Sequence, residues 1–271
     1  MYNIYETFRN EVISMVDQLF MELSALPEVE AIALGGSRAG QHYDERSDYD
    51  IYLYCTAPIA ENIRRSILEK YCSYMEIGNH FWEYEDNCTL NNGIDIDILY
   101  RNLDAFTADV ADVVESCHGR NGYTTCMWHN LRTCKILYDK GNRLAAAKQR
   151  FDIAYPEALR TDIMDRNWKL LRTAMPAYES QINKAVKRGD LVSINHRVSA
   201  FLESYFDLLF ALNRQTHPGE KRLMQLCRET CQTLPEQFEE NLTALFSHMF
   251  RQPEMVARDL DRILDALAKI L

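Results

Sequence analysis

The chain has 271 residues, 47% apolar and 26% charged, a composition typical of a globular protein with one large or two small domains. Its formal net charge of -10 argues against a processive nucleic-acid enzyme and suits a small substrate, for which a cation is one option. No apolar run reaches the roughly 18 residues that cross a bilayer, and residues 1–6 lack the pattern of a signal peptide. We therefore expect a cytoplasmic protein that contacts neither nucleic acid nor membrane.

Strand and helix patterns alternate in the first half of the chain. A helical stripe stops at Pro27, and short apolar runs before Gly35 and Pro58 indicate strands. The turn at 91–93 is of the kind that joins hairpin strands. The expected strands are 29–34, 49–54, 81–84, 94–100 and 135–138, and the expected helices are 5–24, 59–76, 103–116 and 122–134.

From about residue 142 the strand signals vanish. Long amphipathic segments, separated by turns with glycine or proline, predict antiparallel helices with short connections. These helices are expected at 157–187, 191–213, 219–231, 235–249 and 253–270. The predicted fold is α+β: a domain of residues 1–141 with a mixed sheet and helices precedes an all-helical domain of residues 142–271.

Eight cysteines are spread over the chain, and no two of them form a Cys-x-x-Cys pair. The nearest approach to a metal-ligand spacing is Cys126-x-x-His129, which lacks a partner pair. Because the cytosol disfavours disulfides, we expect reduced and mostly buried thiols.

A glycine pair ends the first predicted strand. Gly35 and Gly36 allow the backbone to adopt positive φ and to approach a ligand closely. If a short helix opens here, its free N–H groups and the Ser37 hydroxyl point at an anion, and Arg38 adds positive charge. The same residues also form tight turns that hold no ligand, so this motif alone is a weak signal.

Two pairs of aspartates mark two of the predicted strands. Asp48 and Asp50 are two residues apart and share one face of an extended strand, as do Asp95 and Asp97. Neighbouring carboxylates repel each other, and a divalent cation such as Mg²⁺ removes that penalty. One isolated pair is more simply a solvated acidic turn. Two pairs and a glycine turn in one domain favour a site with two Mg²⁺ ions for in-line displacement at phosphorus.

These motifs resemble those of the polymerase β-like nucleotidyltransferase superfamily over about residues 30–100. The helical second half and the missing basic surface look more like antibiotic nucleotidyltransferases than polymerases. Segments 35–39, 47–50, 100–104 and 212–221 are also similar to bacterial nucleotidyltransferase-domain proteins whose substrates are undefined.

The resemblance implies Asp48 and Asp50 as metal ligands and Gly36 and Ser37 as triphosphate contacts. It leaves the third carboxylate open. We favour Asp97, which lies just before the strand exit, although Asp95 shares its face. Whichever of the two does not bind metal is a candidate base for the proton of the acceptor hydroxyl.

The helical half offers weaker candidates. Lys221 is positioned to add a point charge for the triphosphate, and Asn213 and Arg214 lie near the same turn. Glu203 and Asp207, one helical turn apart, are candidates for contact with a cationic acceptor. For each of these residues a solvated surface position is an equally simple interpretation.

The sequence therefore predicts a nucleotidyltransferase with two Mg²⁺ ions, catalytic Asp48, Asp50, Asp97 and Asp95, and a nucleotide held by Gly36, Ser37, Arg38 and Lys221. An NMP, with AMP from ATP expected, would pass to the hydroxyl of a small molecule, and pyrophosphate would leave. The alternatives are an enzyme that nucleotidylates a protein and a non-catalytic regulator that binds NTP.

Overall fold

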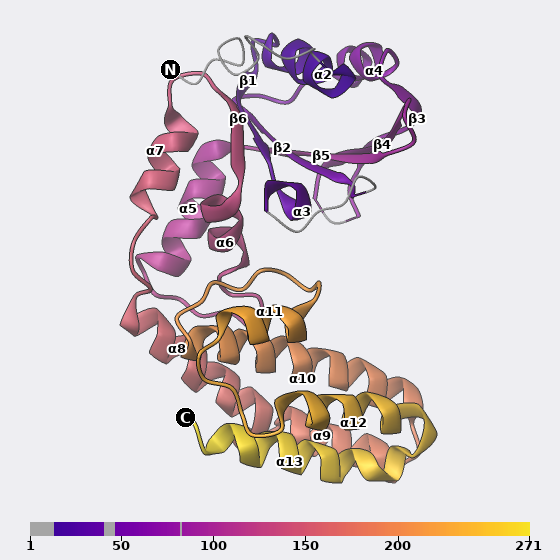
Figure 1. Ribbon diagram of the computed structural model, residues 1–271, viewed down its shortest axis with the longest axis vertical. Coiled ribbons are helices and arrows are strands. Elements are labelled where there is room, and N and C mark those ends of the chain that lie inside the picture. Colours follow the sequence, from indigo (N-terminus) through magenta and orange to yellow (C-terminus); the bar gives the residue numbers. More distant parts are fainter. Residues whose placement is uncertain (1–13, 41–46, 82) are drawn as a thin grey trace. The chain divides into compact units, whose positions relative to one another are not determined.

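The computed structural model describes residues 14–40, 47–81 and 83–271. The chain divides into two compact units (Figure 1). The first unit takes residues 1–110 and 130–153, and the second takes residues 111–129 and 154–271. The chain thus passes between the units three times, after residues 110, 129 and 153. No helix in the described residues is both long enough and apolar enough to span a bilayer.

A six-stranded mixed sheet is the framework of the first unit. Its order is β3-β4-β5-β2-β1-β6, in which β2 and β5 run parallel and all other neighbours run antiparallel. The strands are β1 (Val29–Leu34), β2 (Tyr49–Cys55), β3 (Cys72–Asn79), β4 (Glu85–Leu90), β5 (Asp95–Arg101) and β6 (Lys135–Asp139). This sheet and the helices that follow it in the chain confirm the predicted α+β fold class.

Two helices, α2 (Met15–Ser24) and α4 (Glu61–Leu68), cover one face of the sheet (Figure 1). Ser14 begins α2 with a capping box, in which its side chain accepts from the backbone of Asp17. The earlier part of the helix predicted over 5–24 falls in residues 1–13, outside the described residues. The core between these helices and the strands contains Leu19, Leu23, Ile51, Leu53, Leu68, Ile96 and Ile98. Each fully buried side chain of this size contributes about 1.5–3 kcal/mol.

A buried ion pair stabilises β4, a strand rich in polar residues that the apolar pattern did not predict. Arg64 on α4 pairs with Asp86 on β4, and their side chains are 1% and 0% exposed. Asp86 also accepts hydrogen bonds from the backbone N–H of Gly78, at 2.9 Å, and from the Tyr100 hydroxyl, at 2.7 Å. Because a buried charge is costly unless it is paired, these contacts allow Asp86 to occupy an interior strand position.

The segment between residues 59 and 90 differs from the prediction. The expected helix over 59–76 ends at Leu68, and β3 begins at Cys72. Tyr71 continues the helical spacing of apolar residues, but it packs into the same core from the turn after the helix. The expected strand over 81–84 is also wrong, because residues 81, 83 and 84 form bends between β3 and β4 and residue 82 lies outside the described residues.

The opposite face of the sheet carries polar and aromatic side chains, and α3 (Gly36–Ala39) lies on this side (Figure 1). The ring of Tyr54 lies 5.5 Å from that of Phe106 on α5 (Leu103–Val114). Asn130 on α6 (Cys126–Thr133) donates a hydrogen bond to the Tyr52 hydroxyl at 2.6 Å. Both helices supply residues to both units. The helix α7 (Arg143–Arg150) was not predicted.

Within the described residues, all regular secondary structure of the second unit is helical, as predicted for residues 142–271. The predicted helix over 157–187 is interrupted near Pro176, which lacks the N–H that a continuous helix needs. After the ends of α5 and α6, the elements are α8 (Glu157–Trp168), a π-helical turn (Lys169–Thr173), α9 (Tyr178–Lys187), α10 (Leu191–Leu212), α11 (Leu223–Thr230), α12 (Phe238–Arg251), a 3-10 turn (Pro253–Met255) and α13 (Val256–Ala268). Their core centres on the buried apolar side chains of α10.

Candidate functional site

The predicted glycine turn connects β1 to α3 and packs against β2. Gly36 has a φ of +57°, which favours glycine. A Cβ added at Gly36 would lie 1.7 Å from Oδ2 of Asp50, and one added at Gly35 would lie 2.2 Å from the Tyr52 ring. The backbone N–H of Gly35 also donates to the carbonyl of Asp50 at 2.7 Å. The glycines are therefore required because side chains of β2 lie directly against this backbone.

Ser37 and Arg38 lie within α3, both half-buried. Nε of Arg38 donates to the carbonyl of Ser47 at 2.5 Å, and its guanidinium lies 4.0 Å above the Tyr49 ring. Arg38 thus joins the glycine turn to the residues that lead into β2. These contacts hold a positive charge at the start of β2, the strand that carries Asp50.

The structure brings Asp50 and Asp97 together. The two residues are direct partners in the parallel register of β2 and β5. Both are half-buried, whereas Ile51, Ile96 and Ile98 on the other face are fully buried, as the alternation predicted. Like charges directly opposite each other destabilise a sheet, so this pair is a place where a bound cation would be favourable.

A row of polar side chains continues from this pair across the sheet. Nδ2 of Asn87 on β4 donates to Oδ1 of Asp97 at 2.8 Å. Oδ1 of Asn87 in turn accepts from Nδ2 of Asn79 at 2.7 Å, and Asn79 also donates to Glu76 at 3.1 Å. The row fixes one oxygen of Asp97 and leaves the other without a hydrogen bond from the described residues. Sequence reasoning missed Asn87, although the predicted turn at 91–93 sets its register opposite Asp97.

The other two predicted carboxylates are more exposed. Asp95 lies two residues before Asp97, and its Oδ1 accepts from the Thr89 hydroxyl at 2.8 Å. Asp48 is exposed and precedes β2. Among the described residues, no three His, Cys, Asp or Glu side chains are grouped so that they could hold a metal ion. The carboxylate pair of Asp50 and Asp97, and not a complete set of three ligands, is what this part of the chain provides.

One further cation lies on the same face of the sheet. Arg101 binds Glu83 through two hydrogen bonds of 2.8 and 2.6 Å, and its guanidinium lies 4.1 Å above the Tyr52 ring. Burial opposes the charge of Arg101, but the hydrogen bonds to Glu83 and the electrostatic interactions with Glu83, Tyr54 and Tyr52 together outweigh burial and raise its pKa. Glu85 is buried nearby, and burial raises the pKa of its carboxyl. The alternation that placed Asp95 and Asp97 on this face also places Arg101 there, and could have identified it.

The candidates in the helical half have different environments. Lys221 is exposed just before α11. Arg214 pairs with Glu157 at 2.9 Å, and Asn213 bonds to the backbone at Leu209 and Thr233. The contacts of Arg214 and Asn213 hold turns of the second unit in place.

Asp207 is fully buried and has internal partners. Its carboxylate accepts from the backbone N–H and hydroxyl of Thr124, at 2.9 and 2.7 Å, and from Asn167 at 3.0 Å. Burial raises the pKa of Asp207 to about 6, although these three donors oppose the shift. Asp207 therefore ties the segment around Thr124 to α10, whereas Glu203, one turn earlier, is only half-buried.

Comparisons with known proteins add a family match in the middle of the chain. Residues 124–223 match a family model described as "Domain of unknown function (DUF4037)", which is less than half of the chain. No curated protein matches the sequence. The matched stretch includes Glu203, Asp207 and Lys221.

Among the solved structures that are similar to the chain are the following two. One is a nucleotidyltransferase-like protein from Exiguobacterium sibiricum 255-15, 12% identical, with a TM-score of 0.43 over 94% of this chain and 73% of that one. The other is an aminoglycoside 6-adenyltransferase from Bacillus subtilis, 10% identical, with a TM-score of 0.29 over 96% of this chain and 92% of that one. Both TM-scores are below 0.5.

Proposed function

We propose that the protein is a Mg²⁺-dependent nucleotidyltransferase. It would move an NMP, with AMP from ATP expected, to a hydroxyl of a small molecule and release pyrophosphate. The observation that carries this proposal is the register of Asp50 opposite Asp97, beside the backbone of Gly36. Two adjacent carboxylates next to a glycine turn suit a cation and a phosphate chain at one place.

The donor set fits Mg²⁺ at a nucleotide site. Mg²⁺ is usually bound by one or two carboxylates together with waters and substrate phosphates, and not by a cage made only of protein. Asp50 and Asp97 supply such a pair, and Asp48 would join them as the third predicted ligand. When bound, Mg²⁺ would neutralise phosphate charge and favour ionisation of the attacking hydroxyl.

The residues of the chain would orient the nucleotide around this pair. Gly36 would contact the triphosphate through its backbone, Ser37 offers a hydroxyl donor, and Arg38 supplies positive charge from the same turn. Lys221 is the predicted contact from the helical half.

The transfer itself forms one bond and breaks one. The oxygen of the acceptor hydroxyl bonds to the α-phosphorus, the bond to the bridging oxygen breaks, and the electron pair leaves with pyrophosphate. The hydroxyl proton passes to a base, for which Asp95 is our candidate because it lies on the face of Asp97 and is solvent-accessible.

A pyrophosphate-release assay tests the proposal. Each NTP is combined with Mg²⁺ and with panels of aminoglycosides, lincosamides and nucleotides as acceptors. We expect release with at least one pair, and a loss on the order of 100-fold in Asp50→Asn and Asp97→Asn. Glu69→Gln, which changes an exposed carboxylate at the end of α4, serves as the control and should retain activity.

The same preparations separate the alternatives. A protein adduct with the mass of a nucleotide, found by intact-mass spectrometry, would replace the small acceptor by a protein. Tight NTP binding with no pyrophosphate release would instead indicate a regulator. Equal activity of Asp50→Asn and the unaltered protein would refute the proposed site.

A further inference from the structure

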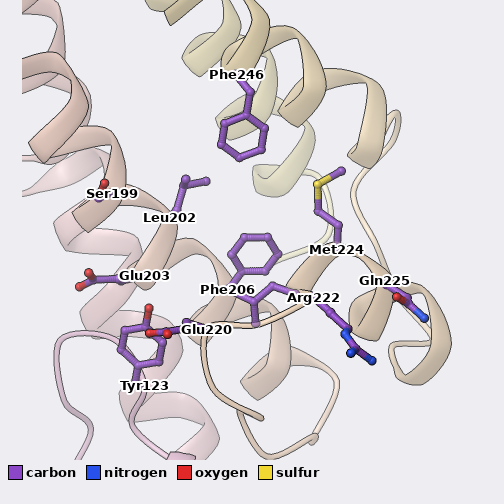
Figure 2. Close-up of a pocket in the computed structure, with 11 residues that line it drawn as sticks. Tyr123, Ser199, Leu202, Glu203, Phe206, Glu220, Arg222, Met224, Gln225 and Phe246 are labelled. Atoms are coloured by element: carbon purple, nitrogen blue, oxygen red, sulfur yellow. The ribbon is translucent and has the colours of Figure 1, made fainter. Parts of the chain in front are cut away.

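The second unit contains an open pocket of about 550 Å³ (Figure 2). None of the residues predicted to hold the metal or the nucleotide lines it, whereas Glu203, the predicted candidate for contact with a cationic acceptor, does. A pocket of this size accommodates a small organic molecule. Its lining comes from α10, α11, α12 and the segments around residues 123 and 220, all within the second unit.

One end of the pocket is acidic. Figure 2 shows Glu203, Glu220 and the hydroxyl of Tyr123 at this end, while Arg222 extends away from them. Within the described residues, neither carboxylate has an ion pair or a hydrogen bond. Burial raises the pKa of Tyr123, and the charges of Glu203 and Glu220 raise it further, which places both carboxylates close to the phenol.

The position of Tyr123 beside Glu203 is fixed by the backbone. Gly122 has a φ of +85°, and a Cβ added there would lie 3.0 Å from Cβ of Glu203. The chain therefore packs directly on α10 at this point. Thr124, two residues further on, is tied to Asp207 on the same helix. The backbone contacts at Gly122 and Thr124 therefore fix the position of Tyr123 beside Glu203.

The remaining wall is apolar. Leu202 and Phe206 come from α10, Met224 comes from α11, and Phe246 comes from α12 (Figure 2). Phe206 is buried, but Phe246 remains 42% exposed, which is unusual for so large an apolar side chain. A ligand lying on Phe206 and Phe246 would remove this surface from water.

We propose that this pocket binds an amphipathic organic cation, whose ammonium group lies between Glu203 and Glu220 and whose apolar part lies on Phe206 and Phe246. An anion would be repelled by the two carboxylates. A neutral apolar molecule would leave both of them uncompensated, and a bare metal ion would leave the aromatic wall unused. The site uses only residues of the second unit, so it does not depend on the proposed transfer reaction.

Calorimetric titration of the full chain with three matched probes tests this proposal. The probes are phenylbutylammonium, the neutral phenylbutanol and the anionic phenylbutyrate, which share one apolar group. We expect the ammonium to bind at least about tenfold more tightly than the alcohol, and the carboxylate to bind least, because the ammonium forms charge-assisted hydrogen bonds.

Variants then assign the two ends of the pocket. Glu203→Gln and Glu220→Gln should each weaken ammonium binding about fivefold, and the double variant should lose the preference over the alcohol. Phe246→Ala should weaken the ammonium and the alcohol by the same factor, about fivefold. Glu254→Gln, at an exposed carboxylate elsewhere in the second unit, and Asp50→Asn should bind as the unaltered protein does.

Three results would overturn the proposal. They are equal binding of ammonium and alcohol, a preference that survives in the double variant, and no detectable binding of the ammonium. Asp50→Asn alters only the proposed transfer site. The cation-binding measurement therefore tests this pocket even if the proposed transfer activity is not found.

Discussion

The Gly36→Ala variant tests the contact between the glycine turn and Asp50. An alanine at a φ of +57° costs about 1–2 kcal/mol of backbone strain. Its Cβ would also lie 1.7 Å from Oδ2 and 2.6 Å from Cγ of Asp50. The carboxylate must leave its position, and an off-rotamer side chain adds about 0.5–1.5 kcal/mol. We therefore expect the first unit to lose about 2–3 kcal/mol.

Gly93→Ala is the matched control for strain without the clash. Gly93 belongs to the same unit and has a φ of +83°, and nothing lies within 4 Å of an added Cβ. Its variant should lose only the strain energy, about 1–2 kcal/mol. Urea unfolding followed by circular dichroism gives both values, and hydrogen exchange of the β2 amides assigns the change to the first unit.

A double-mutant cycle isolates the contact itself. Asp50→Ala removes the two atoms nearest to the alanine Cβ at position 36 and leaves the β-carbon of residue 50 at 3.2 Å. In that background the cost of Gly36→Ala should fall toward that of Gly93→Ala. Gly36→Ala should also abolish Mn²⁺ binding if Asp50 holds the metal. An equal cost for Gly36→Ala and Gly93→Ala, or an unchanged cost in the Asp50→Ala background, would refute the reasoning.

Two further predictions concern Asp97 and Asp207. Asn87→Leu removes the hydrogen bond to Asp97 and should weaken Mn²⁺ binding about tenfold in a paramagnetic-resonance titration. Thr89→Val removes the corresponding hydrogen bond to Asp95 and should have little effect on Mn²⁺ binding. A larger loss of Mn²⁺ affinity in Thr89→Val than in Asn87→Leu would identify Asp95 as the ligand. Burial raises the pKa of Asp207 from 3.8 to about 6, so its protonated form favours folding. The second unit should therefore lose about 2 kcal/mol of stability as the pH rises from 4 to 6. Asp207→Asn should flatten this dependence in urea unfolding, and a difference from the unaltered protein that is the same at pH 4 and pH 7 would contradict the assignment.

The alternation of residues 94–98 was sufficient to predict the acidic face of β5. Side-chain direction in a strand has a period of two and depends little on the rest of the fold. The helical second half was also predictable, because long amphipathic segments and their breaks are local signals. The roles of Asp48, Asp50, Asp95 and Asp97 stay predictions, since no metal or nucleotide binding has tested them.

The polar strand β4 could not be predicted from local pattern. Asp86 is stabilised there by Arg64, 22 residues earlier, and by Tyr100, 14 residues later. These partners are brought together only by the folded sheet, so the run from Glu85 to Asn87 was not recognised as a strand. The pairing of Asn87 with Asp97 could have been predicted, because counting outward from the turn at 91–93 places residue 87 opposite residue 97.

The three passages of the chain between the units limit how the protein can be divided. Residues 111–129 belong to the helical unit, although 24 residues of the other unit separate them from its remainder. A fragment that begins at residue 154 would lack Thr124, and Asp207 would lose two of its three hydrogen-bond donors inside a closed core. Neither unit is one continuous segment of the chain. An exchange of the helical unit between related proteins must therefore include both of its segments.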